Sequence, residues 1–452
     1  MYLPPEAVSD AGQILGHLGP HTSAPHSTDT HPTDIHRTDP HRVDPVPPVR
    51  VLPRQRVDAD DASRVLERHP AWPATLRPEA LAPLALSTPY LALDVDLLAR
   101  HVRDFLDAFE GRVAVRYAVK CNSLPPVLRA VVDAGGSFEI ASAAELDFAL
   151  AAGARAEDIF YSNPVKPSSH VARTAAAGVR RFVVDGLEEI DKIAAVAPGV
   201  EIVVRVRVDD SHSAFPLSAK FGADVDQAEE LLLYAAACGL QPAGLTFHVG
   251  SQCTDARAWS RAIAAVAPVY SRFALDGNPL PLLDIGGGFP ARYGATVPPI
   301  GAIAAVVLSA LDAMPHPPAE IVAEPGRSLV ADTGVLAAEV IGREQRGDRP
   351  WIYLEVGAYN GLMEAAQTGA RWPYPVLAIE AGSGQAYADD DLVTMTVTGP
   401  SCDSSDTVFA DVLLPADLAV GDVLMLGGTG AYTLCYGSSF NGFPPPQPVV
   451  VA

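Results

Sequence analysis

The sequence predicts an α/β protein in which a closed (β/α)8 barrel of the TIM type precedes a mostly antiparallel β domain. The first observation is that eight strand-like runs alternate with alanine- and leucine-rich stretches between about residues 113 and 324. The second is that, after about residue 330, strand-like segments are separated by Gly, Pro and Asp. Strands that alternate with single helices pair in parallel, and eight of them close into a barrel. A doubly wound open sheet is the competing architecture.

The expected barrel strands are short and rich in Val, Ile and Phe, which is typical of buried parallel strands. They are 113–119, 137–141, 158–162, 181–185, 201–208, 243–248, 281–286 and 320–324. The helical stretches between them include 124–134, 142–152, 187–196, 225–238, 256–274 and 301–313.

The expected β domain has little helical periodicity. Its strands are 335–342, 351–356, 376–380, 392–398, 407–413 and 423–427, and the earlier stretch 88–94 is expected to join them. We therefore divide the chain into a tail, an N-terminal segment that partly joins the β domain, a barrel and a C-terminal β domain. The boundaries are 1–50, 51–94, 95–330 and 331–452.

The tail differs in composition from the rest of the chain. Five histidines recur every five residues among Thr, Asp and Pro; they are His21, His26, His31, His36 and His41. That spacing matches neither a helix face nor a strand face, and the prolines oppose both. The tail is predicted to be disordered, and adventitious binding of a transition metal by the imidazoles is the alternative. No metal site is expected elsewhere.

The charge excludes some classes of partner. Lys+Arg number 32 and Asp+Glu 54, so the formal net charge is 32 − 54 = −22. Nucleic acid and anionic membranes would be repelled by such a chain. A cationic small-molecule substrate is compatible with the charge, although solubility alone also explains it.

The cysteines and the apolar runs indicate the compartment. Five widely spaced cysteines form no C-x-x-C motif and no even disulfide framework. Neither a signal peptide nor an apolar run of about 18 residues is apparent. We therefore expect a cytoplasmic protein.

Polar residues stand at the ends of the expected barrel strands. Functional side chains of such barrels lie at the carboxyl ends of the strands. These positions hold Lys120, Glu139, Asn163, Asp185, Arg205, His248, the glycines 286–288 and the segment 324–327. The collection is too polar and too varied for a packing role.

Lys120 is one of only four lysines, with Lys166, Lys192 and Lys220. A lysine that is partly desolvated at a barrel mouth can become a Schiff-base nucleophile. The alternative is a side chain that extends its ammonium group into water.

Residues at other strand ends are suited to binding a phosphate group and an aromatic ring. Gly286, Gly287 and Gly288 expose backbone N–H groups to an anion, or simply form a tight turn. Arg327 can bind phosphate through two hydrogen bonds, and Glu324 can keep a pyridine nitrogen protonated. His248 is a base, a ring-stacking partner or a satisfied buried imidazole.

Six motifs together carry a resemblance. The sequence resembles the fold-type III pyridoxal-phosphate decarboxylases over about residues 86–446, and most closely the eukaryotic-type ornithine/lysine decarboxylases. Diaminopimelate and arginine decarboxylases are more distant. The motifs are Tyr117–Asn122, Phe247–Gln252, Leu283–Pro290, Ala323–Arg327, Gly399–Asp403 and Phe440–Phe443. The resemblance implies an alanine-racemase-like barrel and release of CO2 from an amino acid to give an amine, a polyamine precursor.

The resemblance also assigns roles around pyridoxal 5'-phosphate. Lys120 would bind the cofactor covalently, His248 would stack on its ring, and Glu324 would pair with its pyridine nitrogen. Glu139 would be an acid near the cofactor, and Arg205 a supporting residue. The phosphate would be held by Ser251, Gly286, Gly287, Gly288, Gly326, Arg327 and Tyr432.

The family also shares each active site between two chains. By resemblance, Cys402 would assist protonation of the carbanion in the partner's site, and Asp403 would face the distal amine of the substrate. Tyr359, Glu364, Thr368 and Phe440 are the remaining candidates for substrate binding. A homodimer is therefore expected.

The substrate-facing segment departs from the family. Ornithine decarboxylases carry a Tyr-Asp pair where alignment on Tyr359 places Gln367 and Thr368. Loss of one charged partner costs a buried ammonium about 1.5–3 kcal/mol. Ornithine and lysine lead, with diaminopimelate, arginine or an unusual amino acid as alternatives. An amino-acid racemase and a non-catalytic regulatory relative are the other classes.

Overall fold

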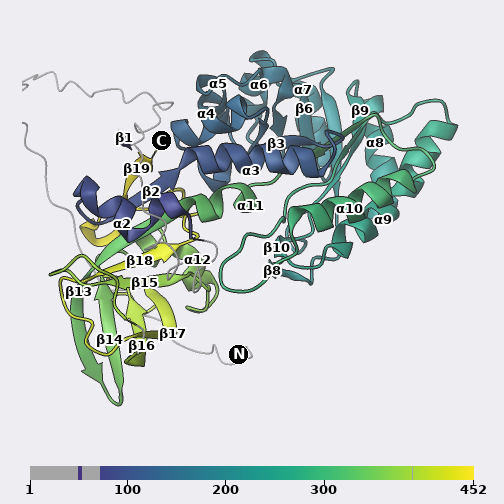
Figure 1. The fold of residues 1–452 in the computed structure, drawn as a ribbon. Coiled ribbons are helices and arrows are strands. Elements are labelled where there is room, and N and C mark those ends of the chain that lie inside the picture. The colour runs from purple at the N-terminus through teal and green to yellow at the C-terminus, as the bar shows by residue number, and fades with distance from the viewer. Residues whose placement is uncertain (1–48, 53–71, 389, 452) are drawn as a thin grey trace, which may run out of the picture. The chain divides into compact units, whose positions relative to one another are not determined.

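The structure, a computed structural model, describes residues 49–52, 72–388 and 390–451 (Figure 1). Eight parallel strands form a closed barrel in the order β11-β12-β3-β4-β5-β6-β7-β9. Pairing of β12 with β3, Val322 opposite Ala114, closes the ring, so the open-sheet alternative is wrong. The strands are β3 (Ala114–Ala118), β4 (Ser137–Ile140), β5 (Phe160–Tyr161), β6 (Arg181–Val184), β7 (Glu201–Val206), β9 (Gln241–Phe247), β11 (Leu282–Asp284) and β12 (Glu320–Ala323).

The main helices surround the barrel and are placed by local signals. Asp94 caps α3 by accepting the Leu97 N–H at 2.8 Å, and Ser142 caps α5 by accepting the Glu145 N–H at 3.2 Å. The helices are α3 (Val95–Ala108), α4 (Pro125–Asp133), α5 (Ala143–Ala151), α6 (Ser168–Ala176), α7 (Leu187–Val196), α8 (Ala228–Ala237), α9 (Arg257–Leu275) and α10 (Ile300–Asp312). All of these helices except α3 and α6 were predicted from the sequence.

The second sheet is mostly antiparallel, as expected. The long strand β13 pairs antiparallel with β2, β14 and β18, whereas β14–β16, β2–β19 and β1–β19 are parallel. The short helix α12 (Met363–Gln367) follows β14. The strands are β1 (Arg50–Leu52), β2 (Tyr90–Asp94), β13 (Gly334–Arg346), β14 (Arg349–Leu354), β15 (Val376–Ile379), β16 (Leu392–Thr398), β17 (Thr407–Pro415), β18 (Val423–Gly427) and β19 (Gln447–Val451).

A loop after β18 joins the β domain to the barrel mouth. The Tyr432 N–H donates to the Cys121 carbonyl at 2.9 Å, and the Asn122 side-chain amide donates to the Gly430 carbonyl at 2.8 Å. These bonds hold the turn Val119–Cys121, which contains Lys120. The segment that bears the predicted nucleophile is therefore fixed by residues more than three hundred positions later.

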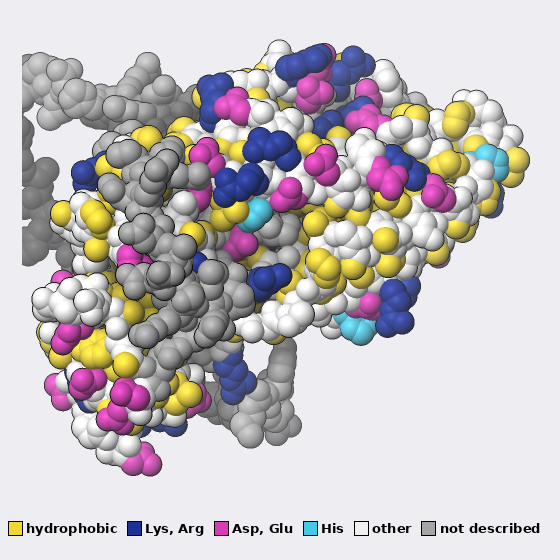
Figure 2. Space-filling view, viewed as in Figure 1, with side chains coloured by type: hydrophobic (Ala, Val, Ile, Leu, Met, Phe, Trp, Pro, Cys, Tyr) yellow, Lys and Arg dark blue, Asp and Glu magenta, His cyan; other side chains and the backbone are white. Residues whose placement is uncertain are grey.

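Several expectations concern what is absent. The histidine tail and its metal-binding alternative lie outside the described residues. Within the described ranges, no helix is both long and apolar enough to span a membrane, and no group of His, Cys, Asp or Glu could hold a metal ion. All five cysteines are free. On the face drawn in Figure 2, acidic and basic side chains are interspersed over the barrel helices.

Candidate active site

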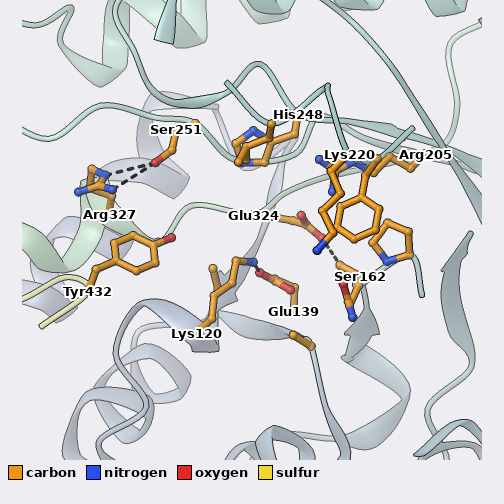
Figure 3. Close-up of a pocket in the computed structure, with 18 of the residues that line it drawn as sticks. Lys120, Glu139, Ser162, Arg205, Lys220, His248, Ser251, Glu324, Arg327 and Tyr432 are labelled. Carbon is orange, nitrogen blue, oxygen red and sulfur yellow. Dashed lines mark hydrogen bonds and ion pairs between the residues drawn. The ribbon is translucent and has the colours of Figure 1, made fainter. Parts of the chain in front are cut away.

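A cavity of about 690 Å³ opens at the carboxyl ends of the barrel strands (Figure 3). Arg327, Ser251 and Tyr432 lie at one side, and Glu324, Ser162 and Arg205 lie at the other, with Lys120 and His248 between them. The predicted residues that line it are Lys120, Glu139, Asn163, Arg205, His248, Ser251, Gly288, Glu324, Gly326, Arg327 and Tyr432. The structure thus brings together side chains that are spread over more than three hundred residues of sequence.

Lys120 extends from the turn after β3 into the cavity, with 49% of its side chain exposed. Its Nζ forms an ion pair with Glu139, which is the third residue of β4 and is 1% exposed. Register places the two elements together, because Ala118 of β3 lies opposite Glu139. The buried carboxylate therefore fixes the amine at the cavity wall.

His248 follows β9 and presents a neutral ring. The Gly250 N–H donates to Nδ1 at 3.0 Å, so Nδ1 is an acceptor and the ring proton belongs on Nε2. Burial, followed by the positive charges of Arg205 and Lys120, lowers the pKa of His248 well below its usual value. The imidazole is therefore suited to stacking on a flat ring rather than to donating a proton as a cation.

Glu324 follows β12 and belongs to a buried acidic cluster. The Ser162 hydroxyl, just after β5, donates to the Glu324 carboxylate. Asp284 is fully buried, and it accepts the Thr246 hydroxyl and the Gly286 N–H, each at 2.8 Å. Burial, followed by the charge of Glu324, raises the pKa of Asp284 well above its usual value. Of the two carboxyl groups in this pair, Glu324 is therefore the one that faces the cavity.

Sequence reasoning missed Ser162. The expected strand 158–162 ends at Ser162, but the polar residue predicted to act at the end of this strand was Asn163. The Asn163 side chain donates to the Val165 carbonyl at 2.7 Å, so it stabilises its own loop. A hydroxyl as the last residue of a short barrel strand was the available signal.

The glycine run has no room for side chains. A Cβ at Gly286 would lie 1.9 Å from the Phe247 carbonyl oxygen, and one at Gly288 would lie 2.4 Å from the Gly250 carbonyl oxygen. Gly286 and Gly288 also have positive φ values of 63° and 97°. At Gly287 a Cβ would lie 3.0 Å from His248 Nε2. Only glycine allows these loops to pack so closely; of the three, Gly288 lines the cavity, whereas the Gly286 N–H donates to Asp284.

Arg327 begins α11 (Arg327–Val330) and is 4% exposed. Its Nη1 donates to Glu364 at 2.8 Å and to the Tyr293 hydroxyl at 2.9 Å, and its Nη2 donates to the second Glu364 oxygen. Its Nε and Nη2 each lie 3.3 Å from the Ser251 hydroxyl. Glu364 was expected to face a substrate; this is corrected, because its carboxylate is buried against Arg327.

Thr368 is placed away from the predicted site. Its hydroxyl donates to the Glu364 carbonyl at 2.8 Å, at the end of α12. The residue lines a separate cavity of about 540 Å³ with Arg371 and Trp372. The expectation that Thr368 faces the substrate is therefore not supported by its position in this chain.

The remaining predicted residues form a second, exposed group. The Tyr359 hydroxyl donates to Asp403 at 2.9 Å, and the Tyr359 and Phe440 ring centroids are 4.5 Å apart. The Asn441 amide lies 3.5 Å from the sulfur of Cys402, which is exposed. None of these residues lines the Lys120 cavity. We call Tyr359, Cys402, Asp403 and Phe440 the exposed group.

The donor set of the cavity fits pyridoxal 5'-phosphate. Two amines line the cavity, those of Lys120 and Lys220; Lys120 is the one expected to take the aldehyde, and one carboxylate, Glu324, is held for a pyridine nitrogen. Neutral His248 provides a flat face. The glycine loop, Ser251 and one edge of Arg327 provide donors for a phosphate.

Comparison with known proteins places the chain in a family. The model for the pyridoxal-binding domain of pyridoxal-dependent decarboxylases matches residues 95–331. The lysine/ornithine decarboxylase of Selenomonas ruminantium is 32% identical over 363 residues, which cover 79% of this chain and 88% of the relative. Antizyme inhibitor 2 of Xenopus laevis is 34% identical over 362 residues, 77% of each chain. The crystal structure of lysine decarboxylase from S. ruminantium is similar with a TM-score of 0.75 and 31% identity, and the match covers 83% of this chain and 96% of that one. The chain therefore belongs to the family of pyridoxal-dependent decarboxylases.

Proposed function

We propose that this pyridoxal-phosphate-dependent decarboxylase releases CO2 from a basic L-amino acid, ornithine or lysine, and acts as a homodimer. The observation that carries the proposal is that Lys120, His248, Glu324 and Gly288 meet in one cavity. When bound, the cofactor supplies an aldehyde for a lysine amine and a ring that accepts electrons from the breaking carboxylate bond.

The chain's own residues bind and orient the reacting groups. Glu139 holds the Lys120 amine at the cavity wall and can accept a proton from it. Glu324, oriented by Ser162, accepts a hydrogen bond from a protonated ring nitrogen. His248 covers one ring face without adding a charge, because its pKa is lowered. In this proposal the phosphate would be held by Gly288, Gly326, Ser251, Arg327 and Tyr432, which all line the cavity.

The exposed group supports a shared active site. Cys402 and Asp403 lie outside the Lys120 cavity of their own chain, so they are available to a second copy. Hydrogen bonds from Ser405, then from Tyr359, lower the pKa of Asp403, which keeps it a carboxylate. In this proposal Cys402 protonates the carbanion, and Asp403 faces the distal ammonium of the substrate.

Charge within the cavity supports this division. The two carboxylates that line the cavity, Glu139 and Glu324, face Lys120 and Ser162. Glu364 pairs with Arg327. A distal ammonium therefore takes its partner from Asp403 of a second copy. The relative named lysine/ornithine decarboxylase supports a diamino acid substrate.

A panel of L-amino acids tests the function. CO2 release is measured with pyridoxal 5'-phosphate present for ornithine, lysine, arginine, diaminobutyrate, diaminopimelate, histidine and glutamate. We expect the highest kcat/KM for ornithine or lysine and no release in Lys120→Ala. Inversion of an amino acid without CO2 would instead indicate a racemase.

A regulatory protein is the second candidate, since one relative is named antizyme inhibitor 2. Retention of Lys120 and Glu324 in the cavity favours the enzyme. A regulatory protein with a vestigial site would show no absorbance band near about 420 nm that depends on Lys120.

A further inference from the structure

We propose that Glu364 is a positioning residue for the phosphate end of the cavity. It clamps Arg327 from the β-domain side and presents the opposite edge of the guanidinium group to the cofactor. The inference rests on the proposed role of Arg327 as a phosphate ligand. It concerns a residue that is outside the six motifs and does not line the cavity.

The hydrogen bonds of Arg327 leave one edge for a ligand. A guanidinium group has five N–H donors. The outer edge is occupied by both oxygens of Glu364 and by the Tyr293 hydroxyl. The other edge, Nε and Nη2, meets the Ser251 hydroxyl at 3.3 Å from each nitrogen. Such distances are long for N–H···O bonds, so this edge is weakly satisfied and faces a cavity-lining hydroxyl.

The surroundings restrict the orientation of the Arg327 guanidinium group. Aromatic rings surround the guanidinium carbon, with the Tyr432 ring centroid at 4.7 Å and the Trp372 centroid at 5.0 Å. Arg327 and Glu364 side chains are each 4% exposed, so no water competes for their bonds. A buried arginine that lost this carboxylate would keep a charge without its main partner. It would then turn toward another acceptor or disorder the cavity wall.

The clamp also joins two parts of the fold. Glu364 lies in α12, which follows β14 of the second sheet, whereas Arg327 follows barrel strand β12. The Thr368 hydroxyl and the turn at the end of α12 hold the helix that bears Glu364. Phosphate affinity is therefore set in part by how the β domain docks on the barrel.

The test separates phosphate binding from binding of the ring. Apoprotein is titrated with pyridoxal 5'-phosphate and, separately, with pyridoxal, and the band near about 420 nm gives each Kd. The ratio of the two Kd values reports the phosphate subsite alone. We expect Glu364→Gln to weaken binding of pyridoxal 5'-phosphate by about ten-fold or more, because a charged hydrogen-bond pair is lost, and to leave pyridoxal binding unchanged.

A second ion pair provides the matched control. Arg181 binds Glu320 with two hydrogen bonds of 2.7 Å at the amino-terminal end of the barrel, away from the cavity. Glu320→Gln should leave the Kd ratio unchanged. Thermal unfolding of each apoprotein, with and without inorganic phosphate, shows whether the variants fold and whether phosphate still stabilises them.

The outcomes distinguish the two claims. If Arg327→Met leaves the Kd ratio unchanged, Arg327 is not a phosphate ligand and the proposed role beneath this inference fails. If Arg327→Met lowers the preference for the phosphorylated ligand but Glu364→Gln keeps or increases it, Glu364 does not position Arg327 and the inference is wrong. Loss of preference in both variants, with Glu320→Gln unaffected, supports it.

Discussion

The cavity and the exposed group are built in opposite ways. In the cavity Glu139 at 1% exposure and Arg327 at 4% are enclosed and paired, and Lys120, which is 49% exposed, pairs with Glu139. In the exposed group Cys402 and Asp403 face outward and Phe440 is 41% exposed. Desolvated charges are costly to rearrange, so the cavity is preorganised for one ligand. The exposed residues have hydrogen bonds but no cover from the described part of their own chain, which is the arrangement expected of one half of a shared site.

The largest effect is expected from replacing Lys120, the proposed nucleophile in the cavity. Lys120→Ala should abolish the band near about 420 nm and reduce kcat by at least about 10³-fold, because we expect Lys220, the other amine that lines the cavity, not to replace Lys120. Absorbance titration and CO2 release measure the two losses. Lys192→Ala is the control, because Lys192 pairs with Glu189 on α7 outside the cavity. Full activity in Lys120→Ala would refute the assignment.

Mixing of two inactive variants tests directly whether the cavity of one chain and the exposed group of a second chain form one active site. Lys120→Ala and Cys402→Ala dimers, each inactive, should regain up to about a quarter of wild-type activity after subunit exchange. Half of randomly formed dimers are mixed, and each mixed dimer has one intact site of two. No activity in a mixture whose exchange is verified by mass-labelled chains contradicts sharing across the interface.

The sequence predicted the enclosed half better than the exposed half. Runs of β-branched residues indicate the barrel strands. Because the carboxyl ends of these strands meet at one end of the barrel, Lys120, Glu324 and Arg327 could be grouped from their spacing in the sequence. The same argument places Glu139 beside Lys120, because the strands β3 and β4 are neighbours in the barrel. The motif resemblance then gave these residues roles that spacing could not give.

Residues in loops and short helices were harder to predict. Glu364 was expected to face the substrate because it lies near Gln367 and Thr368, where the family's carboxylate is missing, but α12 turns it toward Arg327. Ser162 was missed because a single hydroxyl has no periodic signal. The β-domain contacts depend on packing between segments that are distant in sequence, and no local pattern encodes them.

A smaller effect is expected from Ser162. Ser162→Ala removes a donor to Glu324 and should lower kcat/KM by about ten-fold, the cost of one hydrogen bond to a charged group. Ser162→Thr keeps the hydroxyl and should restore most of the activity. Steady-state kinetics on the preferred amino acid compare the three proteins. Equal losses in the Ala and Thr variants would mean that packing, rather than the hydroxyl, matters.

A separate prediction, on stability rather than activity, concerns a lysine that belongs to neither the cavity nor the exposed group. Lys166 is fully buried and donates to the carbonyls of Asn163, Pro164 and Val183 at 2.9, 3.2 and 2.5 Å. Burial, partly offset by Glu189, lowers the pKa of Lys166 from 10.5 to about 8. Between these values the unfolded chain binds more protons than the folded chain, so this residue increases the free energy of unfolding as pH rises.

Urea unfolding at pH 7 and pH 10.5 measures that contribution. The wild type should gain stability relative to Lys166→Met by about 3 kcal/mol across this range. Comparison at each pH cancels the titration of other groups. A constant difference between the two proteins would show that Lys166 keeps its proton when folded.

The bonds between the Lys120 turn and the loop after β18 have a consequence for biosynthesis. The Asn122 amide and the Gly430 carbonyl are 308 residues apart, and β2 completes its pairing only with the last strand, β19. A ribosome adding about 5–20 residues per second emits Gly430 roughly 15–60 s after Asn122. During that interval the nascent chain exposes the lysine turn without its final support. The final support of the lysine turn therefore depends on residues that are synthesised about three hundred positions after it.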